Sequence, residues 1–156
     1  MTHKYVADLF SGRGGVAKAC RQLGLRTREW ELDAGEVFDL VRLPVRQKLK
    51  QDIRQGRVVS VMLAPPCMSF SAARDRTSVI RDKDLPWGRL DASDKDVQKM
   101  ILGNQCMVAA LDIIKECMKA GVPWSTQQVR RHGICLSSFF GPSMRGPQPS
   151  PSISAS

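Results

Sequence analysis

The segment Val58–Ala64, with the sequence VVSVMLA, is the feature that most constrains the fold of this chain. It is apolar at nearly every position and stops at Pro65-Pro66, where the rings and missing N–H groups prevent a sheet from continuing. A run that is apolar on both faces is typical of a central strand in a parallel sheet. Parallel strands need crossover connections, which are usually helices, so this segment predicts an α/β fold.

Strand-like and helix-like segments alternate up to about residue 126, which predicts a doubly wound sheet with right-handed crossovers. The predicted strands are Tyr5–Phe10, Leu25–Leu32, Val58–Ala64 and Val122–Ser125. The predicted helices are Val16–Leu23, Val45–Gln55 and a long one from Ser93, which resembles a capping box with Asp96, to about Ala120. A complete nucleotide-binding sheet has about six strands. We therefore expect an incomplete parallel sheet with flanking helices.

Helical spacing of large apolar residues predicts which face of two helices packs on the core. In the first helix the expected face is Val16, Ala19, Cys20 and Leu23. In the long helix it is Val97, Ile101, Val108, Leu111, Ile114 and Met118.

The 156 residues fit one domain. We expect it to cover residues 1–140, followed by a Pro/Ser-rich tail at 141–156 that is disordered by composition. No apolar run suits a signal peptide or a membrane span. The five cysteines have no CxxC spacing. These features predict a reduced intracellular protein, nuclear or cytoplasmic, with no metal site and no membrane partner; the oligomeric state is left open.

The net charge of +9 and the pI of about 9.8 favour a polyanionic partner, of which nucleic acid is the usual one. The alternative is a generic basic surface. Residues 72–92 show no sustained periodicity and are expected to form a long basic loop. Its candidate nucleic-acid contacts are Arg74, Arg76, Arg81, Lys83 and Arg89.

A glycine-rich turn, SGRGG at residues 11–15, separates the first predicted strand from the first predicted helix. Glycines let the backbone approach a ligand closely, and the helix N-terminus offers free N–H groups. An acid at the end of the next strand can accept hydrogen bonds from ribose hydroxyls; Glu31 is the first candidate and Asp33 the second. The alternative is a tight structural turn beside a solvated carboxylate.

A second turn, LAPPCMSFS, follows the central strand directly and so lies at the carboxyl edge of the sheet. Pro65 and Pro66 stiffen it and aim Cys67 away from the sheet. A rigidly held cysteine at a strand end can act as a nucleophile. The alternative is a buried structural cysteine.

These two turns together resemble motifs of the cytosine-5 DNA methyltransferases. Residues 8–15, DLFSGRGG, are similar to the motif that holds S-adenosylmethionine, and Pro65-Pro66-Cys67 with Phe70-Ser71 are similar to the catalytic motif. Their order and separation also match, over roughly residues 4–126. The resemblance implies a Rossmann-like S-adenosylmethionine-dependent methyltransferase fold. It also implies methyl transfer to C5 of cytosine in DNA, with RNA as a possible substrate.

The resemblance also implies a role for individual residues. Phe10 would pack against the adenine, Glu31 would bind the ribose, and Asp39, preferred over Asp52, would reach the adenine amino group. Cys67 would add to C6 of a flipped-out cytosine, oriented by Pro66. The implied cofactor-binding residues are Phe10, Ser11, Gly12, Gly14, Gly15, Glu31, Asp39 and Pro65.

The chain departs from the family pattern after the fourth predicted strand. Gln127 stands where the family has a glutamate that protonates N3 of cytosine, and no target recognition region follows. A truncated or frameshifted gene copy would produce such a sequence. Three alternatives follow: an active or formerly active methyltransferase, a non-catalytic relic that binds S-adenosylmethionine or nucleic acid, and an unrelated α/β protein with a structural Cys67.

Overall fold

The computed structural model describes residues 3–66, 69, 79–81, 84–89 and 91–126. Cys67, Gln127 and the proposed tail at 141–156 lie outside the described residues, as do Arg74, Arg76 and Lys83. The strands are β1 (Tyr5–Leu9), β2 (Thr27–Trp30), β3 (Val58–Leu63) and β4 (Trp124–Thr126). The helices are α1 (Gly15–Gln22), α2 (Leu43–Arg54) and α3 (Asp94–Ala120), with two 3-10 turns, η1 (Leu32–Ala34) and η2 (Glu36–Phe38).

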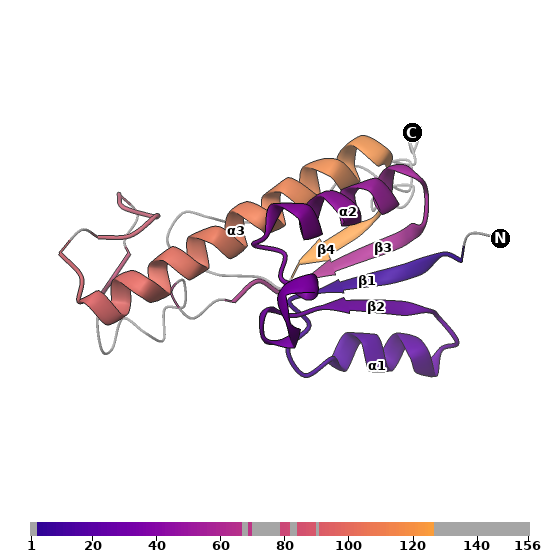
Figure 1. The fold of residues 1–156 in the computed structure, drawn as a ribbon, viewed down its shortest axis with the longest axis horizontal. Helices are drawn as coiled ribbons and strands as arrows, with labels where there is room; N and C mark the ends of the chain where they lie inside the picture. The colour runs from indigo at the N-terminus through magenta and orange to yellow at the C-terminus, as the bar shows by residue number, and fades with distance from the viewer. Residues whose placement is uncertain (1–2, 67–68, 70–78, 82–83, 90, 127–156) are drawn as a thin grey trace, which may run out of the picture.

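The four strands form one all-parallel sheet in the order β2-β1-β3-β4 (Figure 1). This confirms the predicted α/β class. Leu9 pairs with both Trp30 and Leu63, and Leu63 pairs with Thr126. All four strands therefore end at the same edge of the sheet.

The helices cover the two faces of the sheet unequally. Figure 1 shows α1 on one side and α2 with α3 on the other. The chain moves outward from β1 to β2 and then back across β1 to β3, so right-handed crossovers place the connecting helices on opposite faces. The main core lies under α2 and α3, where Leu9, Val61, Leu63 and Ile113 are fully buried.

Helix α3 begins and ends as predicted, but its buried face matches the expected one only in part. Ser93 caps its N-terminus by accepting from the Asp96 amide, and Gly121 ends it with φ 67°. Of the predicted apolar stripe, Ile114 is buried and Leu111 packs against the core, whereas Ile101, Val108 and Met118 are 45–52% exposed. The buried nonpolar residues of the helix are mainly small or contain sulfur, namely Met100, Gly103, Cys106, Met107, Ala109, Ala110, Ile113, Ile114 and Cys117.

Helix α1 also differs from the expectation. Of its residues only Ala17 is buried, whereas Val16 and the following Leu23 are 37% and 79% exposed. The predicted apolar face is therefore wrong. A helix of eight residues sits on the sheet through one small side chain, and its larger apolar residues stay at the surface.

Ion pairs join α2 to α3 along their length. Arg46 Nε and Lys50 Nζ lie 3.1 and 2.7 Å from the carboxylate of Asp112, and Arg54 Nε lies 2.8 Å from Glu116. Burial opposes ionisation of Asp112, yet hydrogen bonds from Lys50 and Arg46 hold its pKa below the ordinary value. The hydrogen-bonded Arg54 guanidinium likewise lowers the pKa of Glu116. Both carboxylates thus favour the folded state when ionised.

We predict that this network makes the fold sensitive to acid. A carboxyl group whose pKa is depressed by folding contributes its full stability above its unfolded pKa, at about pH 5 and higher, and loses it as the pH falls below about 4. Asp112→Asn should lower the free energy of unfolding by about 1 kcal/mol at pH 7, because the pair is partly solvated, and by less at pH 3. Urea unfolding at both pH values measures this difference. Asp33→Asn, which removes an exposed carboxylate, is the control; equal pH dependence of the two variants would contradict the prediction.

Candidate functional site

The turn after β1 is held in an unusual backbone conformation. Phe10 has φ 57° and is the only non-glycine with positive φ among the described residues; Gly12 and Gly14 follow at 53° and 66°. The Ser11 amide donates to the Trp30 carbonyl at 3.1 Å, and the Gly14 amide donates to the Ser11 carbonyl at 2.8 Å. The turn is therefore fastened both to itself and to the end of β2.

The buried carboxylate of Asp8 fixes the start of α1 beneath this turn. Its Oδ2 accepts a hydrogen bond from the Ala17 amide at 3.1 Å, which satisfies one of the free donors at the helix N-terminus. Burial raises the pKa of Asp8, partly offset by that hydrogen bond. Asp8 thus anchors the N-terminus of α1 to the end of β1.

The two left-handed glycines of the turn have different surroundings. A Cβ at Gly14 would collide with the carboxylate of Glu29, which pairs with Arg21, whereas a Cβ at Gly12 would meet nothing within 4 Å. The Glu29 side chain is flexible and can move, so Gly14 is favoured mainly by its left-handed backbone, at φ 66°. Gly12 faces open space, the condition for a ligand to approach the backbone.

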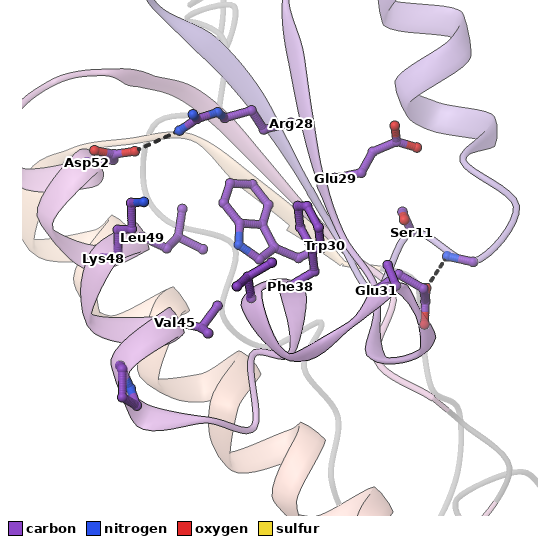
Figure 2. Close-up of a pocket in the computed structure, with 14 residues that line it drawn as sticks. Ser11, Arg28, Glu29, Trp30, Glu31, Phe38, Val45, Lys48, Leu49 and Asp52 are labelled. Atoms are coloured by element: carbon purple, nitrogen blue, oxygen red, sulfur yellow. Dashed lines mark hydrogen bonds and ion pairs between the residues drawn. The ribbon is translucent and has the colours of Figure 1, made fainter.

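That open space belongs to a cavity of about 870 Å³ between the glycine-rich turn, the end of β2, η1 and η2, and α2. Figure 2 shows the indole of Trp30 in the middle of the cavity, with Phe38, Val45 and Leu49 beside it. Glu31 lies at the opposite side, next to the turn. One wall is thus apolar and aromatic, and the other offers polar groups.

Glu31 lines the cavity and is hydrogen-bonded to the glycine-rich turn. One carboxylate oxygen accepts from the Gly12 amide at 2.5 Å and the other from the Leu32 amide at 2.9 Å (Figure 2). This contact fixes the side chain at the boundary between the glycine turn and the aromatic wall. Its remaining lone pairs can accept hydrogen bonds from a ligand.

The structure brings together some of the residues expected at this site. Ser11, Gly12 and Glu31 line the cavity. Phe10 is buried in the core instead. Asp39 accepts from the Val41 amide at 2.8 Å and is not part of the lining, which includes Asp52. Gly14, Gly15 and Pro65 also lie outside the lining.

The proline turn lies at the carboxyl edge of the sheet, as the sequence predicts, and the strand order places it beside the glycine-rich turn. The Ala64 amide donates to the Leu9 carbonyl at 3.0 Å, so Pro65 and Pro66 follow β3 immediately next to the residues that follow β1. Cys67 comes directly after them in the chain but lies outside the described residues.

Sequence reasoning missed the aromatic wall. Trp30 falls inside a predicted strand and Phe38 inside the segment proposed for Asp39, so neither position suggested a ligand contact. Trp30 is 9% exposed and its ring lies 6.2 Å from that of Tyr5. Tryptophan as the last residue of a strand, just before an acid, is the only local signal of this wall.

Arg81, which was expected to contact nucleic acid, is buried. It is 1% exposed, and its guanidinium donates to the Ser69 carbonyl and hydroxyl and to the carbonyls of Pro86 and Met100. Burial lowers its pKa to about 10. Its guanidinium therefore links Ser69, Pro86 and the first turns of α3 through hydrogen bonds. Arg89 lies nearer the surface and pairs with Asp91 at 2.9 Å.

Two of the three cysteines that the structure describes are unsuited to nucleophilic chemistry. Cys106 and Cys117 are fully buried on α3, and burial raises the pKa of their thiols to about 11 and about 12. Cys20 is half-buried and unpaired. Among the described residues, no group of three or more His, Cys, Asp or Glu could hold a metal ion.

The described helices include none that is long and apolar enough to cross a membrane.

Comparison with known proteins gave no matching family model, no matching curated protein and no matching solved structure.

We predict that Arg81 stabilises the folded state. Arg81→Ala should lower the free energy of unfolding by about 3 kcal/mol, because it removes hydrogen bonds and leaves buried carbonyls unsatisfied. Arg89→Ala, the matched control at a partly exposed ion pair, should change it by less than about 1 kcal/mol. Denaturant unfolding of both variants provides the measurement. Similar small effects at the two positions would contradict the buried role.

Proposed function

We propose that this chain is a partial methyltransferase domain of the cytosine-5 DNA methyltransferase type, with a Rossmann-like fold that binds S-adenosylmethionine in the cavity beside the glycine-rich turn. One observation carries the proposal. The glycine-rich turn and the proline turn, which resemble two motifs of that family, follow neighbouring strands of one parallel sheet, and a cavity opens beside the first. Ligands of open α/β sheets bind at this edge.

The chemistry of the cavity suits a nucleoside with a charged tail. Its volume lies within the range of about 300–1,000 Å³ typical of ligand sites. The flat apolar rings of Trp30 and Phe38 are suited to an adenine, and the Glu31 carboxylate to ribose hydroxyls. Ser11 and the backbone of Gly12 would hold the methionine end.

The proposed role of the proline turn is to present a nucleophile to a base. Pro65 and Pro66 would stiffen the chain so that the Cys67 thiolate adds to C6 of a flipped-out cytosine in DNA, or alternatively in RNA. The negative charge that this addition builds on the ring must be neutralised. When bound, S-adenosylmethionine would supply the methyl group to C5 and leave as S-adenosylhomocysteine; loss of the C5 proton would then release the Cys67 thiolate from C6.

One sequence observation favours the second candidate, a binding protein without turnover. Gln127 replaces the glutamate of the family pattern, and a glutamine amide can donate a hydrogen bond to N3 but cannot give it a proton. General acid catalysis is worth roughly 10²–10⁴ in rate. We therefore propose that cofactor binding is retained and that methyl transfer is very slow or absent.

The first test is calorimetry with S-adenosylmethionine. The wild-type chain should bind it, and Glu31→Gln should bind about tenfold more weakly because a charge-assisted acceptor is lost. Asp33→Asn makes the same charge change two residues away at an exposed position and should leave the affinity within about twofold. Absence of binding by the wild type at millimolar ligand would show that the cavity is not a cofactor site.

The second test concerns catalysis and uses DNA that carries 5-fluorocytosine, which traps the cysteine adduct after methyl transfer. The wild-type chain should form little adduct, with a rate about 10²–10⁴ below that of a protein with the glutamate. Gln127→Glu should raise adduct formation, and Cys67→Ser should abolish it. A Cys67-dependent adduct that forms in the wild type as fast as in Gln127→Glu would contradict the proposal.

A further inference from the structure

A second cavity, of about 740 Å³, opens at the amino edge of the sheet, away from the glycine-rich and proline turns. Its wall combines the end of α1, the starts of β1 and β2, and the residue before β3. Figure 1 shows this edge beside the N-terminus of the described chain. The cavity is lined by Arg21, Arg26, Thr27, Arg28 and Arg57 together with Tyr5 and neighbouring residues.

The lining carries more positive than negative charge. Glu29 pairs with Arg21, and Asp52 pairs with Arg28 at 3.4 Å and with Arg57 at 3.1 Å. Arg26 is exposed and forms no ion pair with any described residue. Three guanidinium groups therefore share two carboxylates, and the fourth, that of Arg26, pairs with neither.

Two buried polar atoms of the lining have no hydrogen-bond partner among the described residues: Thr27 Oγ1 and Arg57 Nε. Leaving such an atom unpaired costs about 1–3 kcal/mol, and buried polar atoms are normally satisfied by protein, water or a ligand. Both of these atoms can donate. Both belong to residues that line one cavity with excess positive charge, which points to an anionic acceptor.

Two of the arginines, Arg28 and Arg57, are held in place by a buried carboxylate before any ligand arrives. Asp52 is 5% exposed and accepts from the Tyr5 hydroxyl at 2.6 Å, in addition to pairing with Arg28 and Arg57. The Arg28 guanidinium also lies 5.0 Å from the centre of the Tyr5 ring. Because a fixed guanidinium matches two oxygens of a phosphate at once, this arrangement favours phosphate over a simple monovalent anion.

We propose that this cavity is a phosphate-binding site, which takes the phosphate groups of a small ligand or of a nucleic acid strand. Arg26, Arg28 and Arg57 supply the charge, and Thr27 Oγ1 and Arg57 Nε supply donors that the fold itself leaves unused. The site opens at the other edge of the sheet from the proposed cofactor cavity, although Arg28 lines both cavities, and its test is independent of methyl transfer.

The test is calorimetry with pyrophosphate at low ionic strength. The wild-type chain should bind it, and Arg26→Gln should bind about tenfold more weakly because one charge-assisted contact is lost. Thr27→Val keeps the shape and has no hydrogen bond to lose; it should weaken binding several-fold while its melting temperature stays the same or rises. Lys95→Gln, an equal charge change at the start of α3, is the control and should bind within about twofold of the wild type.

A single-stranded oligonucleotide in the same assay identifies the source of the phosphate. Oligonucleotide binding that pyrophosphate displaces and Arg26→Gln weakens would assign the site to a nucleic acid strand. Pyrophosphate binding with no effect on oligonucleotide binding would assign it to a small phosphate ligand. The proposal is overturned if the wild type fails to bind pyrophosphate at millimolar concentration, or if Lys95→Gln loses as much affinity as Arg26→Gln.

Discussion

The pairing of β1 with a parallel strand on each side is the constraint on which the rest of this structure depends. Leu9, the last residue of β1, pairs with the last residues of both β2 and β3. The chain segments that leave these three strands are therefore neighbours, whatever their separation in sequence. The glycine-rich turn, the carboxylate of Glu31 and the proline turn meet at one edge for this reason alone.

The same constraint decides how much of the fold could be predicted. Strands β1 and β3 are short apolar runs that end at turn signals, and the helices between strands have clear ends, so all four strands and the three helices follow from the sequence, with ends shifted by a few residues. For β2, the predicted Leu25–Leu32 became Thr27–Trp30. The buried face of α3 could be predicted only in part from large aliphatic residues, because small residues such as Gly103 and Ala110 are buried on it while Val108 is exposed.

For the candidate site as well, residues placed by local sequence were predicted, and residues placed by tertiary packing were missed. Ser11, Gly12 and Glu31 were identified because their positions depend on a turn and on the strand next to it. The aromatic wall depends on where α2 packs against the end of β2, which no local pattern specifies, and so Trp30 and Phe38 were missed. Arg81 shows the reverse case, since a basic residue in a segment without periodicity gives no sign that its guanidinium is buried.

Phe10 satisfies two requirements that oppose each other. Its backbone, at φ 57°, favours glycine by about 1–2 kcal/mol, while its side chain, 5% exposed, contributes about 2–3 kcal/mol by burial. Glycine would relieve the strain at φ 57° but leave a cavity in the core, and any other large residue would keep the strain. No single substitution improves both, so position 10 is a local optimum with residual strain. Sequence change at this turn therefore requires compensating changes in the core beneath it.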